Sequence, residues 1–335
     1  MAARVLITGA GGPAAICAYK ALKDRPYDFF MADMDPLATG LYFVEPAKRF
    51  VIPGGIKPGF NEAILNLCKQ HRIDILIPTV DVEFVPLMEI KESFDAIGCR
   101  IVSCKKEVLG IILDKLKLMD KCKGKVILPQ YQSLEEYLIN PQITSKKMVF
   151  KPRSGSGSRG IIITSAPDHK VLENLKKENY MVQEFIGGKE YSIDVMLNKD
   201  SSVAAAVVRE RLKVDSGVVV ASKTIKNKEI QDYCVKIAQA VGVTYGANIQ
   251  VIVDENGTPY LLEINPRFSG GLSLVVESGP NIPLMCVEHA LSGNSIPYVD
   301  YKELAMVRYY EEIYMSDSEF SNHQKALVAK EIKVS

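Results

Sequence analysis

The dipeptide Asn256-Gly257 lies in the segment "NIQVIVDENGTPYLLEIN" and constrains the fold of this chain more than any other short stretch. Asn-Gly between two alternating runs predicts a β-hairpin with a two-residue type I′ turn. Such a turn places Gln250 opposite Glu263 and Asn248 opposite Asn265, with all four side chains on one face. The opposite face is predicted to be apolar and to carry Ile249, Val251, Val253, Tyr260, Leu262 and Ile264.

The polar face of this hairpin gathers oxygen-bearing side chains at one end of a rigid platform. Carboxylate and amide oxygens are ligands that Mg²⁺ accepts together with water and nucleotide phosphates. We therefore predict a metal site at Gln250, Glu263 and Asn265, with Arg267 placed to bind a phosphate or carboxylate bidentately. Gly270-Gly271 follows and allows close approach of a ligand to the backbone. A solvated sheet face with a hydrogen bond between acid and amide is the alternative.

The first hundred residues alternate between short apolar runs and amphipathic stretches. This alternation predicts a parallel, doubly wound α/β sheet. Predicted strands cover 4–10, 27–35, 73–79 and 99–104, and predicted helices cover 13–24, 61–72, 85–98 and 105–123.

From about residue 125 the pattern becomes α+β with antiparallel strands. A glycine-serine loop joins the two strands of a hairpin, and an antiparallel meander follows further along the chain. Predicted strands cover 146–152, 159–165 and 181–186, the predicted meander covers 190–214, and predicted helices cover 171–180 and 228–243. The tail after about 315 carries no clear pattern.

The composition bounds the classes of function. With 335 residues, the chain is long enough for two or three domains. Its net charge of +1, from 41 basic and 40 acidic residues, gives no reason to expect nucleic acid or a membrane as partner. No apolar run is long enough to span a bilayer. The seven scattered cysteines form no CxxC motif, which favours reduced thiols in a cytoplasmic protein.

The segment "VFKPRSGSGSRG" places Lys151 at a strand end before a glycine-serine loop over residues 154–160. No Gly-Lys-Ser/Thr follows, so the loop is not a P-loop. A hairpin tip rich in backbone N–H groups can fold over phosphates, with the Lys151 ammonium beneath. A surface hairpin without function is an equal alternative. In "MVQEFIGGKEYSIDV", a strand ending near Gly-Gly can meet a purine edge, and Glu190 can meet ribose hydroxyls.

In this order, "FKPRSGSGSRG", "VQEFIGGKEYSIDV" and "NIQVIVDENGTPYLLEINPRFSGG" resemble the motifs of the ATP-grasp superfamily. Within it, the chain is similar to the carbamoyl-phosphate-synthase-like branch. The resemblance implies an α/β pre-ATP-grasp (Rossmann-like) domain over 1–111. It further implies an α+β two-lobed ATP-grasp fold, with a linker helix and lid lobe over 112–190, a C-terminal lobe over 191–315 and a tail over 316–335.

The resemblance also implies a role for each matched residue. Lys115 and Lys151 correspond to the nucleotide-phosphate lysines, and Arg267 to the residue that stabilises a phosphorylated intermediate. Gln250, Glu263 and Asn265 correspond to the metal ligands. The remaining nucleotide contacts are the loop residues Ser154, Gly155, Ser156, Gly157 and Gly160, the adenine hinge Gln183, Glu184, Phe185 and Ile186, and the ribose contact Glu190.

The chemistry of the family is an ATP-driven ligation that uses Mg²⁺ or Mn²⁺. A small carboxylate becomes an acyl phosphate, and an amine or similar nucleophile then displaces phosphate. This reaction needs charge neutralisation and positioning rather than a nucleophilic side chain. The chain has only one ATP-grasp half and no glutaminase region, so a stand-alone carboxylate–amine ligase is expected rather than a carbamoyl phosphate synthase, with a homodimer as the candidate assembly.

Two other classes of function are open. "TGAGGPA" gives Gly9, Gly11 and Ala14 after the first strand, with Asp33 and Asp35 ending the second, which fits a dinucleotide fingerprint and an NAD-dependent oxidoreductase. That class leaves Lys151 and the polar hairpin unexplained. A nucleotide-binding regulatory module without turnover is the other alternative.

The substrate residues are the least constrained by the sequence. Asp81 and Glu83 follow a strand of the first sheet and can hold an acceptor amine, although helix capping by Asp81 is the favoured role. Arg209 and Arg211 alternate onto one strand face and can bind a carboxylate, or can simply be solvated. Lys223 is a further candidate for contact with substrate or phosphates.

Overall fold

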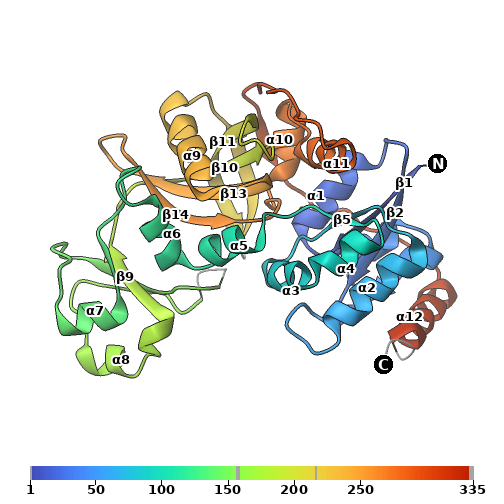
Figure 1. Cartoon of the computed structure of the whole chain (residues 1–335), viewed down its shortest axis with the longest axis horizontal. Helices are drawn as coiled ribbons and strands as arrows, with labels where there is room; N and C mark the ends of the chain where they lie inside the picture. Colours follow the sequence, from blue (N-terminus) through green and yellow to red (C-terminus); the bar gives the residue numbers. More distant parts are fainter. Residues whose placement is uncertain (1, 156–158, 216, 332–335) are drawn as a thin grey trace.

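The structure is a computed structural model that describes residues 2–155, 159–215 and 217–331. Its strands form a five-stranded, a four-stranded and a six-stranded sheet. Figure 1 shows the five-stranded sheet and its helices at one end of the molecule, the six-stranded sheet beside them, and the four-stranded sheet at the other end. Among the described residues, no helix combines the length and apolar character needed to cross a bilayer.

The N-terminal domain contains the parallel sheet that the sequence predicts, with strand order β3-β2-β1-β4-β5. Its strands are β1 (Ala3–Thr8), β2 (Tyr27–Asp33), β3 (Arg49–Val51), β4 (Ile75–Ile77) and β5 (Arg100–Ile101). Its helices are α1 (Pro13–Leu22), α2 (Phe60–His71), α3 (Phe84–Glu89) and α4 (Lys91–Ala96), with 3-10 turns at Thr39–Phe43, Pro46–Lys48 and Asp81–Glu83. The helix predicted over 85–98 is thus two helices, divided at Ile90.

Helices α5 (Lys106–Ile112) and α6 (Lys115–Cys122) connect this domain to the rest of the chain. A single helical stretch was predicted over 105–123, and the structure breaks it at Asp114. The Asp114 side chain accepts hydrogen bonds from the N–H groups of Leu116 and Lys117, at 3.1 and 3.3 Å. Because a capping carboxylate satisfies the first N–H groups of a helix, Asp114 begins α6 and sets the position of Lys115.

The lid lobe, Tyr131–Glu184, is built on a four-stranded sheet with order β6-β9-β7-β8. Its elements are β6 (Tyr131–Ser133), α7 (Leu134–Ile139), β7 (Met148–Pro152), β8 (Ile162–Thr164), α8 (His169–Glu173), a 3-10 turn at Lys177–Asn179 and β9 (Tyr180–Glu184). The predicted hairpin is present as β7 and β8. The helix predicted over 171–180 is wrong for most of its length.

The third sheet is antiparallel, with order β14-β13-β10-β11-β12-β15. Its elements are β10 (Lys189–Leu197), β11 (Val203–Asp215), β12 (Val218–Thr224), α9 (Lys228–Val241), β13 (Tyr245–Val253), β14 (Pro259–Asn265), α10 (Leu272–Ser278), α11 (Ile282–Ser292) and β15 (Ala305–Val307). Helix α9 packs against β10 and β11 through an apolar cluster that includes Ile237 and Ile193. Together with the N-terminal sheet, this lobe confirms the predicted fold class.

The hairpin of β13 and β14 has the predicted pairs at the site, although its turn differs. Gln250 lies opposite Glu263 and Asn248 opposite Asn265, as expected. The connection is longer than the type I′ turn, because Asp254 pairs with Thr258 and only Gly257 of the loop has a positive φ of 85°.

A bulge in β14 corrects for the longer turn. The register shifts between Gln250 and Val251, so that Val251 pairs with Leu261. Leu261 is therefore fully buried, while Tyr260 and Leu262, which were predicted for the apolar face, are half-buried. Since one residue of slip exchanges the faces of a strand, the bulge returns Glu263 to the predicted face.

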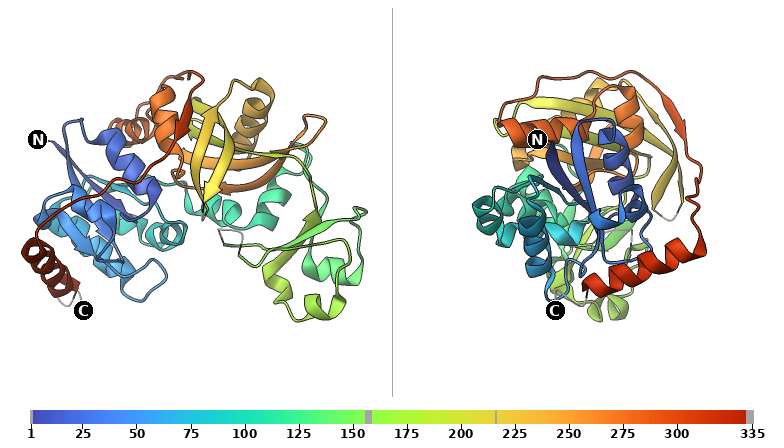
Figure 2. Two further views of the ribbon diagram at one scale, coloured as in Figure 1. Left: turned by 180° about the vertical axis from the view of Figure 1, so that it is seen from behind. Right: turned by 90° about the vertical axis from the view of Figure 1, so that its right-hand side faces the viewer.

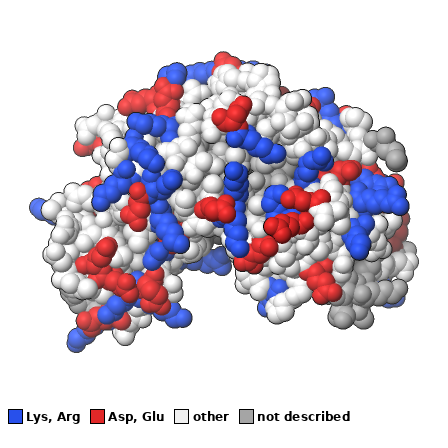
Figure 3. All heavy atoms as spheres, viewed as in Figure 1, with Lys and Arg blue, Asp and Glu red and all other residues white. Residues whose placement is uncertain are grey.

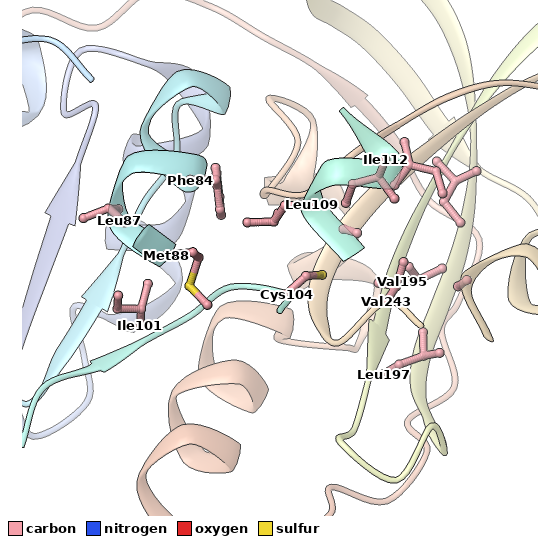
Figure 4. Packing of buried hydrophobic residues seen from close by; sticks show 14 of the residues in the cluster. Phe84, Leu87, Met88, Ile101, Cys104, Leu109, Ile112, Val195, Leu197 and Val243 are labelled. Carbon is pink, nitrogen blue, oxygen red and sulfur yellow. The ribbon is translucent and has the colours of Figure 1, made fainter. Parts of the chain in front are cut away.

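The N-terminal domain and the six-stranded sheet share a continuous core. One cluster of buried side chains runs from Phe84 and Met88 of α3 through Leu109 of α5 to Val195 of β10, as Figure 4 shows. A second cluster joins the other face of the parallel sheet to α10 and α11. The lid lobe has a separate small core around Phe150. Two parts of the molecule are thus packed as one, and the lid lobe is attached to them.

The C-terminal segment returns to the N-terminal domain. Helix α12 (Asp317–Glu331) packs along β3, and Gln324 donates a hydrogen bond to the Tyr42 hydroxyl at 2.8 Å. Figure 2 shows the segment between β15 and α12 running across the molecule to this helix. Helix α12 was not predicted from the sequence.

Candidate active site

One face of the six-stranded sheet carries a row of polar side chains. Glu263 lies opposite Gln250, which lies opposite Ser192, which in turn lies opposite Arg209. Residues directly opposite one another in a sheet point to the same side. The row thus brings the predicted metal ligand Glu263 and the predicted substrate residue Arg209 onto one face, from strands far apart in the sequence.

Glu263 contacts two other residues that the sequence predicts to bind metal or phosphate. The Asn265 amide donates a hydrogen bond to the Glu263 carboxylate at 3.1 Å. The Lys115 ammonium lies 3.3 Å from the other carboxylate oxygen of Glu263 and also donates to the Gly155 carbonyl oxygen at 2.9 Å. Lys115 therefore joins the metal platform to the first part of the glycine-serine loop.

An ion pair that the sequence analysis missed holds Lys115 in this place. The Arg153 guanidinium binds the Asp114 carboxylate through two N–H groups, at 2.7 and 3.1 Å, and the Lys115 N–H donates to the Arg153 carbonyl at 2.7 Å. Burial would raise the pKa of Asp114, but hydrogen bonds from Arg153 and from the Lys117 N–H outweigh burial and lower it. An Asp before a helix is a recognisable cap, but its partner on another strand is not.

Lys151 lies at the end of β7 with only 5% of its surface exposed. Burial, followed by the neighbouring Lys115 ammonium, lowers the pKa of Lys151 to about 7, and the Glu263 carboxylate opposes that shift. Among the described residues, the Lys151 ammonium has no hydrogen-bond or ion-pair partner. A buried cation of this kind is stabilised when an anion such as a phosphate arrives.

The platform fits a divalent cation by its donors and its charge. Gln250, Glu263 and Asn265 supply one carboxylate and two amide oxygens on one face. Glu263 already has a cation, the Lys115 ammonium, against one of its oxygens. With one carboxylate, such a set resembles magnesium sites that rely on phosphate oxygens for the remaining ligands.

The glycine-serine loop is described only in part. Ser154 and Gly155 are exposed and line a cavity, while Ser156 and Gly157 lie outside the described residues. Gly160 has a positive φ of 74°, and a Cβ there would lie 2.9 Å from the Tyr180 hydroxyl oxygen. Gly160 therefore packs closely against β9.

The predicted adenine hinge lies at the end of β9. Gln183 is buried, and its Oε1 has no hydrogen-bond donor among the described residues. The N–H groups of Glu184 and Phe185 donate to the carbonyl oxygens of Gln130 and Lys147, each at 2.9 Å.

The Glu184 and Phe185 side chains of the hinge have partners within the protein, whereas the backbone N–H of Ile186 has none among the described residues. The Glu184 carboxylate accepts from the Gln130 N–H at 2.8 Å. The Lys147 ammonium lies 3.9 Å from the centre of the Phe185 ring. The Ile186 N–H has no acceptor within the described chain, so Ile186 is the hinge residue with a backbone donor left for a ligand.

Glu190, the predicted ribose contact, is ion-paired with Arg211 across β10 and β11. Both residues lie on the polar face of the sheet, two positions from Ser192 and Arg209. The Arg211 Nε is buried and has no hydrogen-bond partner among the described residues. The pair therefore retains a free donor beside the Glu190 carboxylate.

Arg267 connects the platform to the N-terminal domain. Its Nε lies 2.9 Å from the Asp81 carboxylate, and one terminal N–H donates to the Phe268 carbonyl at 3.2 Å. The predicted capping role of Asp81 is wrong, because the turn that begins at Asp81 has no side-chain cap. The long sequence separation of these two residues explains why the sequence could not pair them.

Three substrate candidates have polar partners within the protein. Arg209 is almost fully buried, with its Nε 2.6 Å from the Asp194 carboxylate and a terminal N–H donating to Ser269 at 2.9 Å. Lys223 pairs with Glu210 on the opposite face of the sheet, at 3.1 Å.

Glu83 is the third of these candidates. It is buried and accepts a hydrogen bond from the Thr8 hydroxyl at 2.5 Å, so it presents no exposed carboxylate to an amine. Burial raises the pKa of Glu83 to about 7.

A cavity of about 870 Å³ lies between the platform and the N-terminal domain. Its lining includes Lys115, Glu263 and Asn265 on one side and the loop 55–59 with the start of α2 on the other. Figure 3 shows the molecule hollowed between its two ends, with basic and acidic side chains interspersed over this face. This loop was not predicted from the sequence, although its Gly-Gly and Pro-Gly pairs mark it as a turn.

The glycine loop of the N-terminal domain is covered by the chain itself. The Gly40 N–H donates to the Ala10 carbonyl at 3.1 Å, and a Cβ on Gly40 would lie 2.3 Å from that oxygen. The Asp33 carboxylate accepts from the N–H groups of Gly11 and Asp35, at 2.8 and 2.9 Å. The groups that a dinucleotide requires are thus engaged within the protein, which argues against the oxidoreductase alternative.

Two family models match this chain. Residues 176–313 match one described as "ATP-grasp in the biosynthetic pathway with Ter operon". Residues 5–102 match one described as "PylC-like, N-terminal domain". The predicted ATP-grasp resemblance is confirmed, and its assignment to the synthase-like branch is compatible with both matches.

Solved structures share the whole fold at low sequence identity. Campylobacter jejuni biotin carboxylase has a TM-score of 0.72 and 14% identity, over 89% of this chain and 73% of that one. Staphylococcus aureus N5-carboxyaminoimidazole synthetase with ADP has a TM-score of 0.72 and 14% identity, over 91% and 81%. Bacillus licheniformis L-amino acid ligase has a TM-score of 0.64 and 15% identity, over 87% and 74%.

Proposed function

We propose that this chain, which carries an ATP-grasp domain behind a PylC-like N-terminal domain, is an ATP- and magnesium-dependent ligase. It activates a small carboxylate as an acyl phosphate and transfers the acyl group to an amine, with release of ADP and phosphate. The similar solved structures include a biotin carboxylase in complex with β-γ-ATP, a synthetase in complex with ADP and an amino acid ligase.

The observation that carries the proposal is the meeting of Lys115, Lys151 and Glu263. They come from the start of α6, the end of β7 and the end of β14, and only the tertiary fold brings them together. Two cations and one carboxylate in a partly buried cluster match the charge of a nucleotide phosphate with its metal. An NAD-dependent oxidoreductase does not require this cluster of two lysines and one glutamate.

The protein residues act by binding and positioning. Lys151 and Lys115 neutralise the phosphate oxygens, and the low exposure of Lys151 strengthens its attraction for them. Gln183–Ile186 hold the base, and Glu190 with Arg211 holds the ribose. When bound by Gln250, Glu263 and Asn265, Mg²⁺ supplies further neutralisation of phosphate charge.

Arg267 is the residue that stabilises the phosphorylated intermediate. It lies at the end of β14 beside the platform, and Asp81 fixes its guanidinium. In the first step, a carboxylate oxygen forms a bond to the γ-phosphorus and ADP leaves. In the second step, the amine attacks the acyl carbon, phosphate leaves and the amine loses a proton.

A phosphate-release screen that pairs a panel of carboxylates with a panel of amines tests the proposal. Turnover is expected for at least one pair and is expected to require both components, ATP and Mg²⁺. Glu263→Gln removes the only carboxylate of the platform and should reduce turnover at least a hundredfold, an effect of about 3 kcal/mol. Glu255→Gln, at the exposed tip of the same hairpin, is the matched control and should leave turnover unchanged.

The same screen separates the rival classes. A regulatory module would bind ADP and release no phosphate with any pair, which would contradict the proposed ligase. An oxidoreductase would change nicotinamide absorbance without forming ADP. A homodimer stays a prediction, to be measured by sedimentation of the full chain.

A further inference from the structure

The cavity between the platform and the N-terminal domain has a composition that the ligase reaction alone does not explain. Its floor is the platform, but its other walls are largely aliphatic. They come from the loop 55–59 and the start of α2, from α3 and the turn before it, and from the end of α5. The apolar side chains of these walls include Ile56, Phe60, Val82, Val85, Ile112 and Leu113.

Several of these aliphatic side chains are exposed to water. Ile56 has 77% of its surface exposed, Val82 has 47% and Val85 has 37%. They belong to two segments of the N-terminal domain that face the same space. Apolar side chains that converge on a cavity beside charged reacting groups are typical of a binding site for the apolar part of a ligand.

The polar groups of the same walls include acceptors for a ligand that carries several donors. The Asn61 Oδ1 is buried and accepts no hydrogen bond from any described residue. Glu89 and Asp81 also line the cavity; among described residues, Lys106 lies 3.9 Å from one Glu89 oxygen and Arg267 lies 2.9 Å from one Asp81 oxygen, so each carboxylate keeps a second oxygen as acceptor. A carboxylate ligand has no donor for these oxygens, whereas a primary amine has up to three.

We propose that this cavity binds the amine substrate and that this amine carries an apolar body. The inference rests on the proposed ligase function, since it names the class of the acceptor. The volume of about 870 Å³ also includes the space beside Lys115 and Glu263 that the nucleotide phosphates are proposed to occupy, and the aliphatic walls away from these residues suit a molecule of several carbon atoms rather than ammonia. The exposed Lys57 ammonium in the same loop can pair with an acidic group, so the amine substrate can also carry a carboxylate.

Direct binding to the full-length protein, measured by ligand-observed NMR titration in the presence of ADP and Mg²⁺, tests the apolar part. The probes are n-hexylamine and an ether amine of equal length, so that only the apolarity of the chain differs. We expect hexylamine to bind about tenfold more tightly. The Ile56→Ser/Val82→Ser variant should lose this preference, because the exposed aliphatic wall is gone.

The matched control is Ile139→Ser, which changes an isoleucine with 86% exposure on α7, outside the cavity. It should bind hexylamine as the wild type does. Equal binding of the two amines by the wild type would overturn the proposal, and so would an equal loss in the control variant.

The amine head is tested by comparing hexylamine with hexanol and with hexanoate. We expect hexylamine to bind best, and Asn61→Leu to reduce hexylamine binding several-fold while leaving the binding of hexanoate, which has no donor for Asn61, unchanged. Tighter binding of hexanoate would overturn the assignment of the amine to this cavity. Because these titrations measure binding and need no turnover, their failure can be distinguished from a failure of the phosphate-release screen.

Discussion

At the scale of single residues, Lys151 is a buried amine whose charged form an anionic ligand would stabilise. Burial, followed by the neighbouring Lys115 ammonium, lowers the pKa of Lys151 to about 7 in the free protein. An unfolded chain keeps the Lys151 proton up to the ordinary pKa of 10.5. Burial of Lys151 therefore costs folding free energy below about pH 7, and the cost is relieved as the pH rises.

Nucleotide binding should have the opposite dependence on pH. Phosphates favour the charged Lys151 amine, so binding above about pH 7 takes up a proton. We expect the affinity for ADP, measured by calorimetry, to fall by up to about tenfold per unit between about pH 7 and 9. Lys151→Met should bind weakly at every pH.

The matched control for this titration is Lys228→Met, which removes an exposed lysine of α9 and should follow the wild type. An ADP affinity of the wild type that is constant over this range would show that the Lys151 amine does not meet the phosphates.

At the scale of elements, the turn after β14 depends on a glycine. A Cβ on Gly271 would lie 2.4 Å from a terminal nitrogen of Arg209. Arg209 cannot move aside freely, because Asp194 and Ser269 hold its guanidinium. The Gly270 carbonyl, one residue earlier, accepts a hydrogen bond from Arg308 at 2.6 Å. The turn therefore joins the polar sheet face to the C-terminal segment.

Gly271→Ala should lower the free energy of unfolding by about 2–4 kcal/mol, because it displaces a buried ion pair. Denaturant titration measures this change. Gly110→Ala, on α5 where a Cβ meets nothing, is the matched control and should stabilise the protein by about 1 kcal/mol.

A double-mutant cycle identifies the cause of the loss. In an Arg209→Met background, the alanine at 271 has no guanidinium to displace and should cost less than about 1 kcal/mol. A loss of the same size in both backgrounds would mean that the turn, rather than Arg209, rejects the side chain.

The hairpin of β13 and β14 shows what the sequence can predict at this scale. Alternation and Asn-Gly were enough to predict the pairing of Gln250 with Glu263. The turn type and the bulge were not predicted, because a longer loop and an extra residue in β14 have effects on register that cancel at the site. The packing of Leu261 against the core selects the register with the bulge, and the sequence of β14 alone does not show that Leu261 is the residue to be buried.

At the scale of the whole molecule, the two large parts share two cores, and the cavity lies where they meet. Strand–helix alternation predicted the parallel sheet, and three motifs in order predicted the ATP-grasp lobes. Contacts across domains could not be predicted in the same way. Arg267 with Asp81 and Arg153 with Asp114 are pairs of common residues, and only the folded chain shows which acid meets which base.

The central claim is that Glu263 and its neighbours on β13 and β14 hold a divalent cation together with nucleotide phosphates. The most direct test is the binding of Mn²⁺ to the full-length protein with ADP, followed by electron paramagnetic resonance. We expect wild type and Glu255→Gln to bind Mn²⁺ with equal affinity, and Glu263→Gln to bind it at least about tenfold more weakly. Wild-type affinity for Mn²⁺ in Glu263→Gln would contradict the account.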